Sequence, residues 1–289
     1  MTFYVKTDEP TFTRNLKAEL EKYGMKESEK FPIGIVFISG NASRNRELFN
    51  MKQSTLTNVA IKIPIASKVE LHKLMKGHEF IKDFDVIDDD VIPPFKKLRI
   101  LKPVDGYQGK GITLVRNIED VRSWLSSHTS KEWLLQDYIL NPALKDGHKF
   151  HLRVPIIMVM NRVYVSIRSP YYLAKEPYKK EDWLNANIHD THYNPKFSYV
   201  YPDDLPDTWK RSKDIYSMFK TVFAGITLKP DWNSKHSFKV FGADIMFDKR
   251  VPILIEVNDQ IGLKKMEFII PGLVAILLGK EQSDFVRVI

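Results

Sequence analysis

The stretch FGADIMFDKRVPILIEVN, residues 241–258, constrains this chain more than any other part of it. Both halves are typical of strands, and the polar residues DKR connect them. If the hairpin is centred near Arg250, Asp244 lies opposite Glu256, with their Cβ atoms about 5 Å apart on one face of the sheet. Asn258 follows Glu256 by two residues and therefore points to the same side.

Two directly opposed carboxylates destabilise a sheet unless a cation lies between them. The apolar residues that flank this pair predict a half-buried sheet, in which an unpaired charge costs more. Carboxylate and amide oxygens suit Mg²⁺, which usually keeps waters and is shared with substrate phosphates. Two interpretations remain open: a metal site formed by Asp244, Glu256 and Asn258, or a surface hairpin whose acids pair with Lys or Arg elsewhere.

A glycine-rich loop follows the predicted strand that carries Lys102, in the stretch RILKPVDGYQGKGITLV. Gly106, Gly109 and Gly111 would let backbone N–H groups approach a phosphate, and a fixed lysine would supply a charge to the same group. The GK[ST] arrangement of a Walker loop is absent from this stretch, and a strand rather than a Rossmann helix follows the glycines. An ordinary hairpin turn is the alternative interpretation.

A row of basic residues marks the stretch KFHLRVPIIMVMNRVYVSIRS. Lys149, His151 and Arg153 alternate and therefore share one face of a predicted strand, and Arg168 on the return strand adds a fourth base. Together with Lys102, these groups could neutralise a polyphosphate or the oxyanion of an acyl-transfer step. A solvated basic face is the alternative.

The order of predicted elements favours a mixed α+β architecture with antiparallel hairpins, built in two or three lobes. We expect three segments, 1–66, 67–139 and 140–289. Predicted strands cover 33–38, 59–65, 99–102, 134–139, 150–160, 163–168, 238–247 and 253–258, and predicted helices cover 13–23, 67–76, 118–127, 214–225 and 262–278.

Composition narrows the class of protein. The chain has 289 residues and no cysteine, which excludes disulfide frameworks, zinc fingers and cysteine nucleophiles. Its formal net charge of +8 favours acidic partners, although no block of five like charges occurs and a merely basic surface is the alternative. The N-terminus lacks the apolar core of a signal peptide, and the longest apolar stretch, 268–278, is too short to span a bilayer. We expect a soluble, cytoplasmic protein without a membrane partner.

The motifs in their order along the chain resemble one family. The lysine and glycine-rich loop, QDYI, KFHLR, an arginine on the next strand, HDTH and finally D…ExN are similar to the tubulin–tyrosine ligase-like branch of the ATP-grasp ligases. The similarity extends from Leu98 to Asn258, and the N-terminal segment matches only in outline. The chain resembles a divergent, compact member of that family.

The resemblance implies an ATP-grasp fold of the α+β class, with ATP and Mg²⁺ held between antiparallel sheets of two to three lobes. Residues 1–66 would be an N-terminal α/β subdomain, 67–139 the central lobe, and 140–289 the C-terminal lobe with the metal site. The implied reaction is ATP-dependent ligation of an amino acid to a protein carboxylate through an acylphosphate, plausibly on an acidic, tubulin-like tail. Alternatives are a binding protein that has lost catalysis, a ligase of small peptides, and, from charge alone, a nucleic-acid-binding protein, which is the least favoured.

The resemblance also implies site residues, carried over position by position. Those that would bind the phosphate and reacting acyl groups are Lys149, Arg153 and Arg168, and those that would hold magnesium are Asp244, Glu256 and Asn258. The residues that would contact ATP are Lys68, Lys102, Gly109, Lys110, Gly111, Gln136, Asp137, Tyr138, Ile139, Lys149, His151, His189, Thr191, Asp244 and Asn258. The chain departs from the family pattern in two segments: KFDxR becomes KFHLR, so that His151 replaces an aspartate, and HLTN becomes HDTH.

Overall fold

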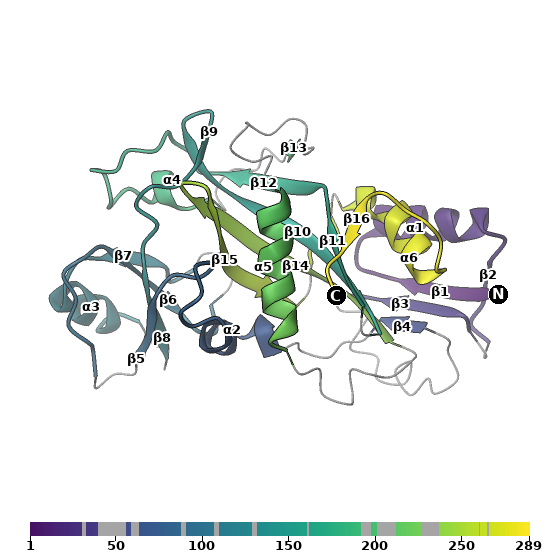
Figure 1. Ribbon diagram of the computed structural model, residues 1–289, viewed down its shortest axis with the longest axis horizontal. Helices are drawn as coiled ribbons and strands as arrows, with labels where there is room; N and C mark the ends of the chain where they lie inside the picture. Colours follow the sequence, from purple (N-terminus) through teal and green to yellow (C-terminus); the bar gives the residue numbers. More distant parts are fainter. Residues whose placement is uncertain are drawn as a thin grey trace.

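The computed structural model describes residues 1–30, 33–39, 56–58, 64–87, 91–106, 110–128, 132–160, 162–191, 198–200, 212–226, 237–259, 261–264 and 266–289. Among them it forms one sheet of twelve strands and one of four, with helices packed against both (Figure 1). The predicted α+β architecture with antiparallel hairpins is confirmed. None of the helices in these ranges is long and apolar enough to cross a membrane.

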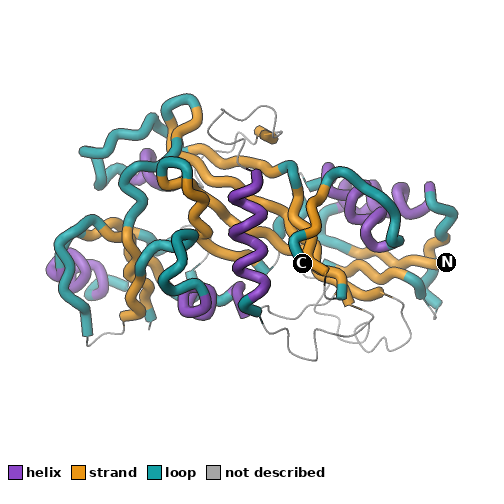
Figure 2. The backbone as a smooth tube through the Cα atoms, in the orientation of Figure 1, coloured by secondary structure: helices purple, strands orange, loops and turns teal. Residues whose placement is uncertain are grey.

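Two long antiparallel strands, β10 and β14, form the centre of the large sheet. Their register runs from Leu152 opposite Ile245 to Val159 opposite Phe238. Helix α5 crosses this part of the sheet and buries apolar side chains against it (Figure 2). The elements of this region are β9 (Leu144–Lys145), β10 (His148–Val159), β11 (Arg162–Ser166), β12 (Ser169–Leu173), α4 (Ala186–His189), β13 (Ser198–Val200), α5 (Ser212–Ala224), β14 (Ser237–Asp248), β15 (Val251–Asn258) and β16 (Phe285–Arg287).

The N-terminal strands extend this same sheet instead of forming a sheet of their own, because β4 pairs in parallel with β14 at Ser237 and Phe238. Helices α1 and α6 pack on them around a core that includes Phe3, Phe12 and Leu273 (Figure 1). The division of the chain into three segments stays a prediction. The elements here are β1 (Thr2–Lys6), α1 (Pro10–Lys22), β2 (Lys26–Glu27), β3 (Ile35–Ile38), β4 (Leu56–Asn58), η7 (Glu267–Ile269) and α6 (Ile270–Leu277).

The small sheet has the order β5-β8-β6-β7, with every neighbouring pair antiparallel. Helix α3 packs on it through Val121, against a buried core that includes Leu101 and Trp133. Its first turn is capped by the Asn117 side chain, which accepts the backbone N–H of Asp120 at 2.8 Å. The elements are η3 (Pro64–Ala66), α2 (Lys68–Leu74), β5 (Phe84–Ile87), β6 (Arg99–Pro103), β7 (Thr113–Val115), α3 (Ile118–Leu125) and β8 (Trp133–Asp137).

Proline explains three differences between the predicted and observed elements. Helix α1 begins at Pro10, three residues before the predicted start, because proline needs no hydrogen-bond acceptor in the first turn. The predicted helix 262–278 is wrong in length, since its α-helical part begins only at Ile270, next to Pro271. The predicted strand 59–65 is wrong at its end, where Pro64 opens a 3₁₀ turn; residues 59–63 lie outside the described ranges.

Candidate active site

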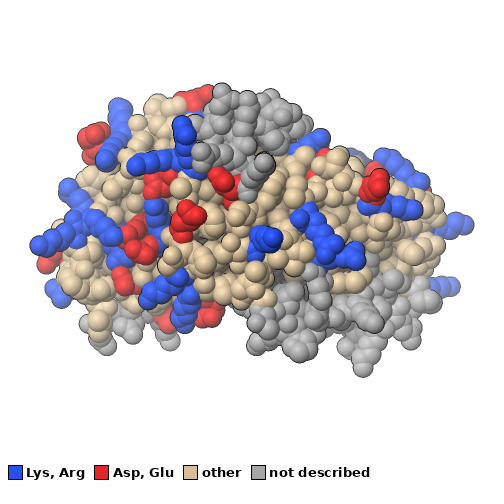
Figure 3. Space-filling view, in the orientation of Figure 1, with Lys and Arg blue, Asp and Glu red and all other residues tan. Residues whose placement is uncertain are grey.

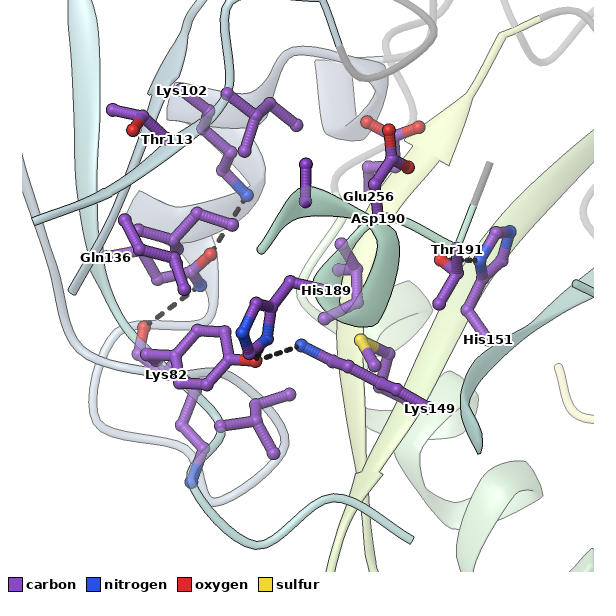
Figure 4. Close-up of a pocket in the computed structure, with 18 of the residues that line it drawn as sticks. Lys82, Lys102, Thr113, Gln136, Lys149, His151, His189, Asp190, Thr191 and Glu256 are labelled. Carbon is purple, nitrogen blue, oxygen red and sulfur yellow. Dashed lines mark hydrogen bonds between the residues drawn. The ribbon is translucent and has the colours of Figure 1, made fainter. Parts of the chain in front are cut away.

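A cavity of about 240 Å³ lies between the small sheet and the large sheet (Figure 4). Its walls combine apolar and charged side chains. The apolar side chains include Ile100, Ile112, Leu114, Met246 and Ile255, and the charged ones include Lys68, Lys82, Lys102, Lys110, Lys149, Asp190, Asp244 and Glu256.

Two lysines enter from the side of the small sheet. Lys102 on β6 is buried and donates to the side-chain oxygen of Gln136 at 2.9 Å (Figure 4). Burial lowers the pKa of Lys102 to about 8. Lys68 at the start of α2 donates to the carbonyl oxygens of Gly106 at 2.7 Å and Val104 at 3.2 Å, so it is fixed against the predicted glycine loop.

The glycine loop packs tightly at its base. A Cβ atom on Gly106 would lie 2.4 Å from the Pro103 side chain, so only glycine fits there. Gly111 has a positive φ of 76° and does not line the cavity, whereas Lys110 does. Gly109 lies outside the described residues.

The predicted segment Gln136–Ile139 lines the cavity where β8 ends. Tyr138 donates its backbone N–H to Leu98 at 3.3 Å, and its hydroxyl accepts a hydrogen bond from Lys149 at 2.8 Å. The same hydroxyl lies 2.5 Å from Nδ1 of His189. Burial of the Lys149 ammonium lowers its pKa to about 7.

The three bases of β10 point to one face, as predicted, and each has a partner there. His151 lies 2.6 Å from the Thr191 hydroxyl through Nδ1 (Figure 4). The His151 ring also stacks on Tyr172, with centroids 4.7 Å apart. Arg153 binds both oxygens of Asp244, at 2.8 Å each. The carboxylate of Asp244 therefore neutralises part of the charge of the basic row.

The structure does not bring Arg168 to the cavity. The return strand β11 pairs only with Ile156–Val159 of β10, and a separate strand, β12, pairs with the part that carries His151. Tyr172 lies opposite His151, while Arg168 lies between β11 and β12 and forms an ion pair with Asp284 at 3.5 Å. The predicted strand 163–168 ends early, at Ser166, and Arg168 lies beyond it.

Asp244 lies opposite Glu256, which confirms the predicted pairing, but for a different reason. The turn has two residues, so the ladder begins with Asp248 opposite Val251 and would place Ile255 opposite Asp244. A β-bulge between Asp244 and Ile245 shifts the register by one residue and brings Glu256 to the cavity face.

This pair, together with Asn258, has the donor set that suits magnesium. Burial and the neighbouring Asp244 raise the pKa of Glu256. Lys68 lies 4.0 Å from Glu256, and the Asn258 amide donates to Asp244 at 3.2 Å. Within the described ranges no cluster of three or more His, Asp or Glu suits a metal, so the magnesium site stays a prediction.

Trp183 lines the cavity and contacts an arginine that follows a strand of the small sheet. The Arg116 guanidinium, just after β7, lies 4.0 Å from the centroid of the Trp183 ring. Trp183 belongs to a loop whose base is tied by Glu176, which accepts hydrogen bonds from Asn185 at 3.1 Å and Asn187 at 2.9 Å. The loop therefore presents Trp183 from a fixed base.

Two residues near the cavity, His72 and Arg116, were not picked out from the sequence. His72 left a usable signal, since it follows Lys68 by four residues and so shares its face of the predicted helix. From the sequence, Tyr172 and Trp183 were expected to be packing residues rather than site residues; Trp183 lines the cavity, and Tyr172 stacks on His151.

Comparison with known proteins agrees with this geometry. The Tubulin-tyrosine ligase family matches residues 41–221. Relatives include the probable tubulin polyglutamylase ttll-9 of Caenorhabditis elegans, 27% identical over 63% of this chain and 48% of that protein. Tubulin glycylase 3B of Drosophila melanogaster is 26% identical over 56% of this chain and 25% of that protein. The chain thus spans half or less of the length of these curated relatives.

A solved structure matches over the whole chain. The C-terminal domain of K. lactis Pby1, described as an ATP-grasp enzyme interacting with the mRNA decapping enzyme Dcp2, superposes with a TM-score of 0.71 at 19% identity. The match covers 100% of this chain and 98% of that one, and at this identity it shows the fold alone. With the two sheets, the cavity between them and the family match in agreement, the chain has an ATP-grasp fold and belongs to the tubulin-tyrosine ligase family.

Proposed function

We propose that this chain is an ATP-dependent ligase that joins an amino acid to a carboxylate on a protein. The observation that carries the proposal is the cavity itself, which is lined both by Lys68, Lys102 and Lys149 and by the opposed carboxylates Asp244 and Glu256. Lysines that face a carboxylate pair across a slot suit a polyphosphate shared with a divalent cation.

The nucleotide would lie with its base in the apolar part of the cavity, between Ile100 and Leu114 on one side and Met246 on the other. The backbone at Gln136–Ile139 borders this part and would form the hydrogen bonds to adenine. The triphosphate would then extend towards Lys68, Lys102 and Glu256.

Magnesium would be held by Asp244, Glu256 and Asn258, and when bound it neutralises phosphate charge. The fit rests on the buried like charges, because Glu256 has its pKa raised by burial and by Asp244. Lys68 and Arg153 supply part of the missing positive charge, from 4.0 Å and 2.8 Å respectively.

The chemistry proceeds in two displacements. An oxygen of the acceptor carboxylate attacks the γ-phosphorus of ATP, the bond to the ADP oxygen breaks, and an acylphosphate forms. The amine of the amino acid then attacks the acyl carbon, a tetrahedral oxyanion forms, and phosphate leaves as the nitrogen loses a proton. Lys149 and Arg153 would hold the negative charge that develops, and a bound triphosphate would favour the protonated form of Lys149.

The proposed acceptor is an acidic, tubulin-like tail. The net charge of +8 would attract such a tail, and basic side chains are frequent over the end of the molecule that carries the small sheet, with acidic ones among them (Figure 3). The names of the relatives, tubulin polyglutamylases and glycylases, point to the same class of acceptor.

Intact mass spectrometry tests the proposal. Tubulin and the chain itself are incubated with Mg-ATP and all twenty amino acids, and an Asp244→Asn/Glu256→Gln double variant serves as the control. A residue-sized mass increment that the double variant abolishes would establish ligation and identify the amino acid. No increment on either protein would count against the activity.

A second candidate is an ATP-binding protein without turnover. His151 stands where the family pattern has an aspartate, and its Nε2 lies 4.0 Å from Asp244, which Arg153 already engages. This candidate predicts ATP binding by calorimetry with no mass increment. A gain of ligation in a His151→Asp variant would then show which residue had silenced the site.

A further inference from the structure

His72 lies directly behind the cavity and has no solvent exposure. It is on α2, one helical turn after Lys68, and its ring meets Phe84 edge-on at 4.9 Å. Its Nδ1 lies 2.6 Å from the carbonyl oxygen of Lys68, and its Nε2 lies 2.7 Å from the side-chain nitrogen of Gln136.

These two contacts define the proton positions. A carbonyl oxygen only accepts, so Nδ1 of His72 carries the hydrogen and Nε2 is an acceptor. The Gln136 amide must then turn its NH₂ group to His72, which leaves its oxygen facing Lys102 at 2.9 Å. Burial and the charge of Lys102 lower the pKa of His72 to about 3, in agreement with a neutral ring.

The Gln136 amide is fully used by this arrangement. Its NH₂ group faces His72. The same group lies 3.4 Å from the carbonyl oxygen of Lys82, and the amide oxygen accepts from Lys102 (Figure 4). The Gln136 side chain therefore holds Lys102 in place, and only the backbone of Gln136–Ile139 would hydrogen-bond the adenine of a bound nucleotide.

We propose that His72 is a positioning residue, which through the Gln136 amide holds Lys102 ready for the phosphates of a bound nucleotide. The inference rests on the proposed function in that it needs ATP in this cavity. Lys68 and His72 together make α2 a clamp, since the first fixes the glycine loop and the second fixes the strand beside it. A residue that only packs would need the ring but not its nitrogens.

Calorimetric titration of ATP and of adenosine tests the role of the nitrogens. His72→Phe keeps the ring and removes the acceptor, and we expect ATP affinity to fall about fivefold to tenfold, the worth of one buried hydrogen bond, with adenosine affinity unchanged within about twofold. His72→Gln, whose oxygen can accept from Gln136, should restore most of the loss. The control is His78→Phe, the same substitution at an exposed histidine just after α2.

Gln136→Met breaks the same series of hydrogen bonds, from His72 through Gln136 to Lys102, at its middle member. It provides a second test if His72→Phe does not fold. The losses of ATP affinity from the two substitutions should not add, because both break this one relay of hydrogen bonds. Additive losses, or equal losses for ATP and adenosine, would overturn the positioning role.

Nitrogen NMR of the histidine side chains separates this inference from the proposed function. In the chain without nucleotide, His72 should keep the neutral form with hydrogen on Nδ1 between pH 5 and pH 8. A ring that carries its hydrogen on Nε2 would overturn the relay whatever the chain binds. A wild-type chain that shows the expected ring but binds no ATP would overturn the proposed function, and with it the role of His72 towards phosphates.

Discussion

Replacing Arg153 by methionine removes the guanidinium that faces the carboxylate pair. The Arg153 side chain is 18% exposed and the Asp244 side chain 4%, and the two share hydrogen bonds of 2.8 Å at both carboxylate oxygens. Breaking such a buried pair by removing one partner costs about 3–5 kcal/mol, because the remaining charge stays buried. Here the cost falls on a carboxylate that already faces Glu256.

The melting temperature converts this cost into an observable. The chain of 289 residues has an unfolding entropy of about 0.6 kcal/mol/K, from about 2.1 cal/mol/K per residue. Arg153→Met should therefore melt about 5–8 °C below the wild type in EDTA. Millimolar Mg²⁺ should raise the melting temperature of the variant more than that of the wild type, because a cation then replaces the lost charge.

Circular dichroism melts with and without Mg²⁺ measure both effects. Arg153→Met/Asp244→Asn should recover most of the loss, since the unpaired charge is gone, and Arg162→Met controls for the same substitution at an exposed arginine of β11. A drop of less than about 2 °C, or a double variant no more stable than Arg153→Met, would refute the reasoning.

Three further predictions follow from the same cavity. Burial lowers the pKa of Lys149 to about 7, against 10.5 for an exposed lysine. Between these values the folded state holds fewer protons than the unfolded state, so the free energy of unfolding should rise with pH. Lys149→Met should flatten that rise in thermal melts taken from pH 7 to pH 10, and the variant should melt higher than the wild type at pH 7. Arg116→Ala should speed dissociation of a fluorescent ATP analogue about twofold to fivefold in stopped flow, the worth of an exposed contact with the Trp183 ring, and an unchanged rate would show that the contact does not retain nucleotide. Arg168→Gln should leave ATP affinity in calorimetry unchanged, because its partner is Asp284; a tenfold loss would return Arg168 to the site.

Local patterns in the sequence predicted the three long strands that carry the site, β10, β14 and β15, but missed several shorter strands of the same sheet, among them β1 and β12. Alternating apolar residues fixed the strands on both sides of the DKR turn, and the alternation of Lys149, His151 and Arg153 correctly placed them on one face. These properties depend on neighbours along the chain, so periodicity is enough to find them.

Pairings between distant segments could not be predicted in the same way. Nothing in the local pattern says that β10 changes its partner from β12 to β11 along its length, and so Tyr172 took the place expected for Arg168. The relay from His72 to Lys102 likewise depends on how α2 packs behind β8, which no spacing in either segment encodes.

The bulge in the hairpin has a consequence for how the site accommodates change in chain length. In a regular strand consecutive side chains point to opposite faces, yet Ile255 and Glu256 both line the cavity. The extra residue places an apolar side chain, Ile255, and a carboxylate, Glu256, side by side in the cavity wall, so that under the proposed function the base and the phosphates of ATP would contact adjacent residues. The site is therefore more sensitive to the length of this hairpin than to its side chains. A substitution changes one group in the cavity wall, whereas inserting or deleting a single residue changes which side chains of the strand face the cavity.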